Sequence, residues 1–203
     1  MNSMRFSVKS HFLNFLIYVS LTIFFASQPC LAQTSETHSN SSNDFIRTAC
    51  GVTRYPEICY QSLSAYAQSI KTDPFQLANV ALSVTMKEAQ NTSTTVTKLL
   101  LESQNLTTKE TNAIRDCVEN MKGSVSELKQ SLVAMEDLKG PDFEMQISNI
   151  QTWVSAALTN EDTCMDGFEG KAMNGKIKDT LSNFIEKVAQ LTSNALALIN
   201  KLY

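Results

Sequence analysis

The sequence predicts an all-α protein, an antiparallel up-down-up-down four-helix bundle with an N-terminal helical hairpin and two disulfides. Four long segments between residues 74 and 202 carry apolar residues in steps of three and four, a spacing that keeps one face of each helix against its neighbours. The connections between these segments are short, which favours antiparallel packing. No strand-like alternation of useful length occurs.

The first 32 residues have the features of a secretory signal peptide. Arg5 and Lys9 give a basic start, and an apolar run over residues 12–26 follows. The run is shorter than the roughly 20 residues that span a bilayer, so a cleaved signal is preferred over an uncleaved anchor. Cys30 and Ala32 are small residues at the positions that a signal peptidase recognises, and cleavage is predicted after Ala32.

The composition of the mature chain excludes several classes of function. Loss of Arg5 and Lys9 reduces 17 basic residues to 15, against 20 acidic ones, so the formal net charge is −5. Such a chain is not suited to nucleic acid, and no second apolar span would hold it in a membrane. His38 is the only mature histidine and lies in the polar segment 33–43, which we expect to be a disordered lead-in. A Ser-His-Asp or Cys-His site therefore cannot be assembled, and we predict no catalytic residues, metal or cofactor.

The bundle domain is expected over residues 44–203. It begins with two short helical pieces in residues 44–66, packed as a hairpin with a bend at Gly51 and Pro56. Asp73-Pro74 then provides an N-cap followed by proline, and the first long helix runs to about Leu101. Its predicted buried positions are Leu77, Ala81, Val84, Val96, Leu99 and Leu100.

Three further helices complete the predicted bundle. Residues 107–110 form a capping box for the second long helix, which ends at Gly140-Pro141. The third runs from about Phe143 to Glu161, and the fourth lies within residues 177–202. Their predicted core positions are Ile114, Val118, Met121, Val125, Leu128, Leu132 and Met135, then Ile147, Ile150, Val154 and Leu158, then Ile177, Leu181, Phe184, Val188, Leu191, Ala195, Leu198 and Leu202.

Four cysteines remain after cleavage: Cys50, Cys59, Cys117 and Cys164. In an exported chain they predict two disulfides, and their spacing does not fit a zinc finger. If the second and third helices fold back at Gly140-Pro141, Cys117 and Cys164 each lie 23 residues from the turn. They are therefore expected to meet at the end of the helix pair that is farthest from the turn. This favours a Cys117–Cys164 bridge and leaves Cys50–Cys59 as a local one.

A stripe of hydroxyl residues on the third helix is a candidate protein-binding surface. These side chains recur at helical spacing roughly opposite the apolar seam, and they are short, neutral and easily desolvated. The members are Ser148, Thr152, Ser155, Thr159 and Thr163. An ordinary solvent-facing surface, or a small-residue face that lets two helices pack closely, would give the same pattern.

Two pairs of carboxylates also share a helix face, Asp116 with Glu119 and Asp162 with Asp166. Glycosidases use two carboxylates, but a bundle offers no evident cleft of sugar length. A solvated helix face, or electrostatics at a helix end, is the preferred interpretation of both pairs.

Three N-x-Ser/Thr sequons begin at Asn40, Asn91 and Asn105 and are candidate glycosylation sites in an exported chain. Asn40 and Asn105 are expected to be exposed. Asn91 lies in the middle of a helix and suits a glycan only if it faces outward.

Three segments carry a resemblance to a known family. The first is Phe45-Ile46-x-x-x-Cys50 with Thr53-x-Tyr55-Pro56-x-x-Cys59, and the second is Ala113-x-x-Asp116-Cys117-x-Glu119. Both resemble plant invertase and pectin methylesterase inhibitors. The third, residues 151–168, looks specifically like the pectin methylesterase inhibitor branch. The match covers about residues 44–202 and all four mature cysteines.

The resemblance implies a secreted, apoplastic protein, monomeric when free, that binds plant pectin methylesterase one to one. In that family the inhibitor lays its helices across the pectin-binding cleft of the enzyme and blocks substrate entry, so that homogalacturonan keeps its methyl esters. We expect the outer face of the second and third helices to make the contact, foremost through Thr152, Ser155, Thr159 and Thr163.

The sequence is also compatible with other functions. Acid invertase inhibitors share the fold and the cysteines, although residues 139–143 do not match the Pro-Lys-Phe tripeptide associated with invertase targeting. The same domain also precedes some pectin methylesterases, but the chain stops at Tyr203 and no enzyme is expected to follow. The family often has a further cysteine in the last helix, which this sequence lacks. A secreted helical ligand or structural wall protein, and a carboxylate-based hydrolase, are alternatives from other classes.

Overall fold

The computed structural model describes residues 33–104, 106–138, 140–169 and 175–202. Every element in these ranges is a helix, which confirms the predicted all-α class. The expected signal peptide lies outside the described residues. The elements are α2 (Gln33–Cys50), α3 (Pro56–Leu63), the 3₁₀ helix η1 (Ser64–Tyr66), α4 (Ala67–Ile70), α5 (Pro74–Glu102), α6 (Thr108–Glu136), α7 (Phe143–Asp166) and α8 (Lys176–Ile199).

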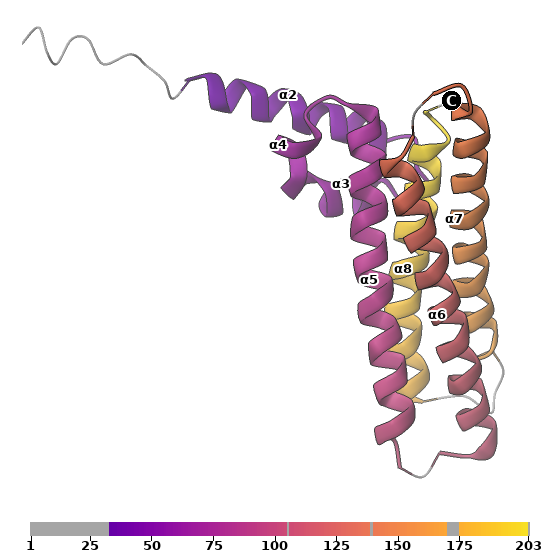
Figure 1. Ribbon diagram of the computed structural model, residues 1–203. Coiled ribbons are helices and arrows are strands. Elements are labelled where there is room, and N and C mark those ends of the chain that lie inside the picture. Colours follow the sequence, from indigo (N-terminus) through magenta and orange to yellow (C-terminus); the bar gives the residue numbers. More distant parts are fainter. Residues whose placement is uncertain (1–32, 105, 139, 170–174, 203) are drawn as a thin grey trace, which may run out of the picture. The chain divides into compact units, whose positions relative to one another are not determined.

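The four long helices α5 to α8 form the bundle, which belongs to the unit His38–Tyr203 of the chain (Figure 1). Each long helix packs against the next, and α8 closes the ring against α5. As a result, α5 lies diagonally opposite α7. Short connections between consecutive neighbours are those of the predicted up-down-up-down bundle. None of the described helices is long and apolar enough to cross a membrane.

The start of α5 follows directly from its sequence. The Asp73 side chain accepts hydrogen bonds from the backbone N–H groups of Phe75, at 2.8 Å, and Gln76, at 3.4 Å. Pro74, the first helical residue, has no N–H that would need a partner. The predicted N-cap therefore satisfies backbone donors that a helix leaves free at its first turn.

The predicted capping box also forms at the start of α6. The Thr107 hydroxyl accepts a hydrogen bond from the Glu110 N–H at 3.2 Å, and the Glu110 carboxylate accepts one from the Thr107 N–H at 2.8 Å. The hydrogen bond from the Thr107 N–H, and to a lesser extent the one from the Thr107 hydroxyl, holds the pKa of the Glu110 carboxyl below its ordinary value. At the other end of α6, Gly140 has a φ of +85°, which glycine adopts without steric cost, and the chain turns there.

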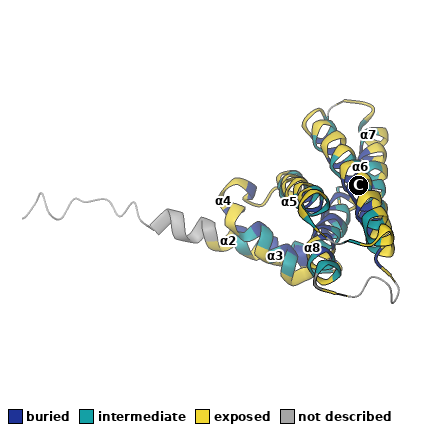
Figure 2. Cartoon of the chain, turned by 90° about the horizontal axis from the view of Figure 1, so that it is seen from below, coloured by how far each residue is buried: buried dark blue, intermediate teal, exposed yellow. Residues whose placement is uncertain are grey.

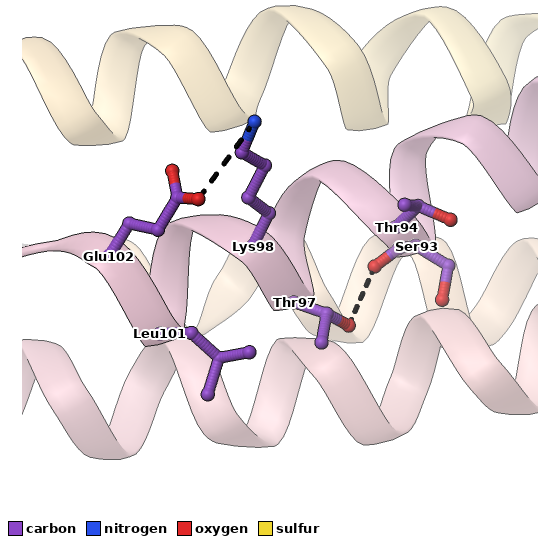
Figure 3. A pocket seen from close by; sticks show the side chains of 6 residues that line it. All are labelled: Ser93, Thr94, Thr97, Lys98, Leu101 and Glu102. Atoms are coloured by element: carbon purple, nitrogen blue, oxygen red, sulfur yellow. Dashed lines mark hydrogen bonds and ion pairs between the residues drawn. The ribbon is translucent and has the colours of Figure 1, made fainter.

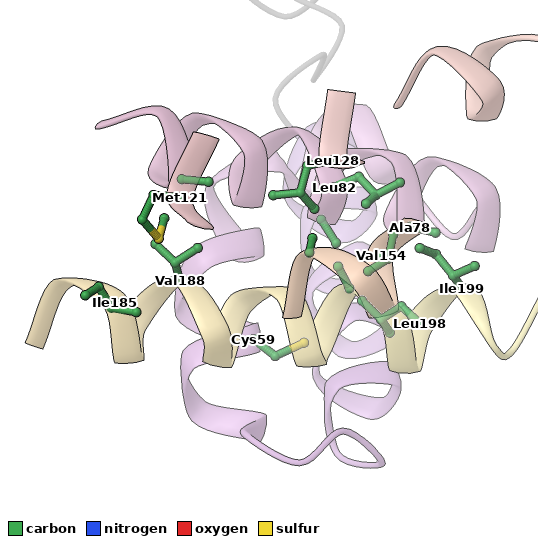
Figure 4. Packing of buried hydrophobic residues seen from close by; sticks show 14 of the residues in the cluster. Cys59, Ala78, Leu82, Met121, Leu128, Val154, Ile185, Val188, Leu198 and Ile199 are labelled. Atoms are coloured by element: carbon green, nitrogen blue, oxygen red, sulfur yellow. The ribbon is translucent and has the colours of Figure 1, made fainter. Parts of the chain in front are cut away.

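The core lies between the four long helices and is built mainly from aliphatic side chains (Figure 4). Buried residues lie along the inward side of the bundle helices, and exposed residues lie along their outer side (Figure 2). The predicted core positions that are buried are Leu77, Ala81, Val96, Ile114, Val118, Met121, Leu128, Met135, Ile147, Ile150, Val154, Leu181, Val188, Leu191, Ala195 and Leu198. Those that are half-buried are Val84, Leu99, Leu100, Val125, Leu132, Leu158, Ile177 and Leu202.

One predicted core position is wrong. Phe184 is 39 % exposed, whereas Ile185 is fully buried. The buried positions Leu181, Ile185 and Val188 are spaced by four and then three residues, which keeps them on one face of a helix with 3.6 residues per turn. The expected spacing from Leu181 was three residues and then four, which assigned the inward position to Phe184 and not to its neighbour Ile185.

Residues 33–43, where a disordered lead-in is expected, form the first part of helix α2 in the structure. Within the part whose side chains are described, Ser42, Ile46 and Cys50 recur every four residues and are buried. They share one helix face that packs on the core, and Cys50 is bridged to Cys59 across Cα atoms 5.5 Å apart. This buried face is not evident from the composition of the segment, because one of its members, Ser42, is polar.

One asparagine of α8 connects the bend of the N-terminal hairpin to the bundle by hydrogen bonds, in addition to the apolar packing of the hairpin on the core. Asn194 accepts a hydrogen bond from the Tyr55 N–H at 3.1 Å, and its amide nitrogen donates to the Tyr55 carbonyl at 2.9 Å. Tyr55 immediately precedes α3, so both backbone groups at the hairpin bend are paired with a single buried side chain.

Candidate functional site

The hydroxyl stripe lies on the outside of α7, as predicted from its spacing. All five members, Ser148, Thr152, Ser155, Thr159 and Thr163, are exposed. The opposite side of the helix carries the buried residues Ile147, Ile150, Val154, Ala157, Glu161 and Cys164. Because α7 continues to Asp166, five residues beyond the expected end at Glu161, Thr163 is part of the same continuous face. The close-packing alternative therefore does not apply among the described helices, since the stripe faces away from them.

The stripe is polar but carries no formal charge. Thr152 donates its hydroxyl proton to the Ser148 carbonyl at 2.9 Å, and Thr159 donates to the Ser155 carbonyl at 3.0 Å. Thr163 donates to the Thr159 carbonyl at 2.7 Å. These bonds occupy the hydroxyl protons and leave oxygen lone pairs facing solvent, ready to accept hydrogen bonds from a partner.

Exposed charged residues occur on α6 and around the C-terminal end of the stripe on α7. On α6, Lys122 and Glu119 are exposed and form an ion pair of 2.9 Å. On α7, Asp162 and Asp166 are exposed beside the last turn of the stripe. Charged residues outside a neutral centre are typical of protein interfaces, where the rim is polar and charged groups are depleted from the middle.

The two carboxylate pairs are exposed and do not line either of two hollows on the surface of the bundle. Glu119 is engaged by Lys122, and Asp116 is exposed one residue before Cys117. One hollow, of about 370 Å³, lies along α5, and another, of about 360 Å³, lies between α3, α5 and α8. Neither is lined by a residue of α6 or α7, so neither brings a carboxylate pair into an enclosed site. No group of three or more metal-ligating side chains occurs among the described residues.

The Cys117–Cys164 disulfide joins α6 to α7 beneath the end of the stripe. The two Cα atoms are 4.4 Å apart, and both residues are buried. The bridge lies next to Asp116 on one helix and Thr163 on the other. It therefore fixes the register of the two helices whose outer surfaces form the candidate site, as the hairpin geometry predicted.

A buried acid behind the stripe escaped the sequence analysis. Glu161 is fully buried and accepts hydrogen bonds at Oε1 from the hydroxyls of Ser124, at 2.6 Å, and Thr192, at 2.9 Å. Burial raises its pKa to about 7, although both hydrogen bonds lower it, and the charge of Asp162 adds to the rise. The spacing of buried residues could have indicated this site, because Glu161 lies four residues after Ala157 and three before Cys164, on the buried face of α7.

Two of the three predicted glycosylation acceptors can be placed. Asn40, on α2, and Asn91, on α5, are both exposed. Asn105 lies outside the described residues. The outward orientation that a glycan on Asn91 requires is therefore present.

Comparisons with known proteins agree on one family. The family model described as plant invertase/pectin methylesterase inhibitor matches residues 44–198. The chain is 46% identical over 162 residues to a "21 kDa protein" of Daucus carota, covering 78% of this chain and 83% of that protein. It is 41% identical over 192 residues to Pectinesterase inhibitor 9 of Arabidopsis thaliana, covering 92% of this chain and 91% of the relative.

The fold also matches a solved structure. The crystal structure of a mutant form of a pectin methylesterase inhibitor from Arabidopsis superimposes with a TM-score of 0.63, covering 76% of this chain and 95% of that chain. The sequences are 20% identical in this comparison, which supports the shared bundle fold.

Proposed function

The chain belongs to the plant invertase/pectin methylesterase inhibitor family, and we propose that it is a secreted inhibitor that binds pectin methylesterase one to one in the cell wall. The observation that carries this proposal is the similarity to Pectinesterase inhibitor 9, which extends over nearly the full length of both chains. The family membership and the helical bundle are consistent with a protein that acts by binding and not by catalysis.

We place the enzyme-binding surface on the outer face of α6 and α7. The hydroxyl stripe supports this choice because its side chains are short and uncharged, and its three threonines are already hydrogen-bonded within the helix. Bringing such groups into an interface costs less than desolvating charges, and their free lone pairs can accept bonds from backbone or side-chain donors of the enzyme. The charged residues on α6 and around the C-terminal end of the stripe would remain at the rim.

The proposed mechanism is steric. Two helices joined by the Cys117–Cys164 disulfide form a rigid surface that covers the pectin-binding cleft and prevents the polymer from entering. A preformed surface needs little ordering on binding, which favours affinity. Inhibition would leave methyl esters on homogalacturonan and so limit its cross-linking by calcium in the wall.

Titration against two enzymes tests the target. Purified mature protein is added in known molar amounts to pectin methylesterase and, separately, to acid invertase at about pH 5 to 6. We expect linear loss of methylesterase activity with an end point at one inhibitor per enzyme, and unchanged invertase activity. Loss of invertase activity alone would show that the protein is an inhibitor of acid invertase. Loss of neither activity would favour a ligand or structural role, and product release by the protein alone would show that it is an enzyme.

A further inference from the structure

A sequon in the middle of α5 is not accounted for by the proposed inhibition. It consists of Asn91, Thr92 and Ser93. Thr92 is buried against the core, whereas Asn91 is exposed and Ser93 is half-exposed on either side of it. A glycan attached to the Asn91 amide therefore points into solvent and leaves the packing of the bundle undisturbed.

We propose that Asn91 carries an N-linked glycan and that the glycosylated outer face of α5 is excluded from enzyme docking. The transfer needs an oligosaccharide linked to a lipid diphosphate as donor. The Asn91 Nδ2 atom forms a bond to the anomeric carbon of the first sugar, the bond from that carbon to the diphosphate oxygen breaks, and the amide loses one proton. The lipid diphosphate leaves. The donor belongs to the secretory route that the first 32 residues predict.

The surface beyond Asn91 has room for a branched sugar chain. Thr94 and Lys98 follow Asn91 on the same side of the helix, and Lys98 lies about 10 Å along the axis. Here α5 borders the hollow of about 370 Å³ lined by Ser93, Thr94, Thr97, Lys98, Leu101 and Glu102 (Figure 3). Leu101 is 79 % exposed, and the Lys98–Glu102 ion pair, 3.9 Å long, is also exposed, so no other part of the described chain occupies this surface.

The position of α5 in the bundle determines whether a glycan on Asn91 affects enzyme docking. Since α5 packs against α6 and α8, it lies diagonally opposite α7, which carries the hydroxyl stripe. A bulky sugar on α5 is therefore remote from the stripe on α7, although α6, the other helix of the proposed surface, adjoins α5. We expect docking through the stripe to be unhindered. This second part of the proposal depends on the proposed inhibition through α7, whereas glycosylation of Asn91 does not.

Mass spectrometry of the full chain secreted from a eukaryotic host tests the modification. We expect peptide N-glycosidase to remove a glycan from the peptide that contains Asn91 and to convert this residue to aspartate. Ser93→Ala destroys the sequon and should abolish the conversion, while the matched variant Ser93→Thr keeps the sequon and should retain it. Since peptides are read separately, modification of Asn40 or Asn105 does not obscure the result. An Asn91 peptide found only in unmodified form would overturn the proposal.

Inhibition assays test the consequence. The glycosylated protein and the Ser93→Ala variant are compared in the pectin methylesterase titration, with circular dichroism to verify equal helicity. We expect their inhibition constants to agree within about twofold. A tenfold stronger inhibition by Ser93→Ala would show that the α5 face takes part in docking and would overturn this part. If neither protein inhibits, the proposed function and this consequence fail together, while the mass measurement still decides whether Asn91 is modified.

Discussion

The Glu161 carboxylate of α7 accepts a 2.6 Å hydrogen bond from the Ser124 hydroxyl of α6 inside the bundle. Thr192 of α8 donates to the same oxygen, so one acid connects three of the four long helices. The second oxygen, Oε2, is buried and has no hydrogen-bond partner among the described residues. The ion pairs found among the described residues do not involve Glu161, so burial dominates and raises its pKa to about 7.

This acid should make the fold less stable as the pH rises. The folded-state pKa lies above the ordinary value of 4.5, so the folded protein holds the proton more tightly than the unfolded chain. The stabilisation is fully present below pH 4.5 and is lost between pH 4.5 and about 7, where ionisation would place an unpaired charge in the core. The shift corresponds to about 3 kcal/mol. Urea unfolding at several pH values measures it.

Glu161→Gln isolates this contribution because it keeps the shape of the side chain and removes the proton equilibrium. We expect the variant to lose the decline in unfolding free energy above pH 4.5 and to exceed the wild type at pH 8. Glu144→Gln, in the exposed first turn of the same helix, controls for the loss of one negative charge. Equal pH slopes for the wild type and Glu161→Gln would contradict the assignment.

The two disulfides should differ in their contribution to stability. In the chain-entropy model the Cys117–Cys164 bridge, with a sequence separation of 47, contributes about 4 kcal/mol, and the Cys50–Cys59 bridge, with a separation of 9, about 2.7 kcal/mol. Double Cys→Ser variants of each pair, compared by chemical unfolding, test this order. If loss of the short bridge costs as much as loss of the long one, loop entropy does not govern the difference.

The architecture of this protein was predictable because its signals are local. Helix periodicity, the Asp73 N-cap, the Thr107 capping box and the distances of Cys117 and Cys164 from Gly140-Pro141 each depend on a short stretch of chain or on one turn. These features determine the helix type, the starts of α5 and α6 and the pairing of α6 with α7 without knowledge of the packed core.

The features that sequence analysis missed depend on packing between distant segments. Ile185 displaces Phe184 from the core because the neighbouring helices select which of two adjacent apolar residues faces inward. Glu161 lies in the seam because Ser124 and Thr192, 37 and 31 residues away, supply its donors. None of these partners is identifiable from the local sequence.

Removing the Asn194 side chain should loosen the N-terminal hairpin. Asn194→Ala leaves the Tyr55 N–H without its partner, whereas the Tyr55 carbonyl keeps the hydrogen bond that it accepts from the Cys59 N–H at 3.0 Å. An unpaired, partly buried backbone donor costs about 2 kcal/mol. Asn183→Ala, at an exposed position of the same helix, serves as the control. Hydrogen exchange is the direct measurement, since the Tyr55 amide should exchange faster in Asn194→Ala than in the control. Unchanged protection at Tyr55 would show that the hairpin is held elsewhere.

A charge placed in the middle of the hydroxyl stripe should weaken inhibition without unfolding the protein. Thr159→Arg puts a guanidinium at an exposed position that the proposed interface buries, where an unpaired charge is costly. We expect inhibition of pectin methylesterase to weaken at least tenfold, or by about 1.4 kcal/mol, with unchanged melting. Thr94→Arg on α5 is a matched control, because Thr94 is exposed and donates to the Gln90 carbonyl at 2.9 Å, as Thr159 does to the Ser155 carbonyl. Since α5 lies opposite α7, the control should inhibit like the wild type. Equal losses in both variants would point to a general charge effect, and full inhibition by Thr159→Arg and Ser155→Arg would move the docking surface away from the stripe.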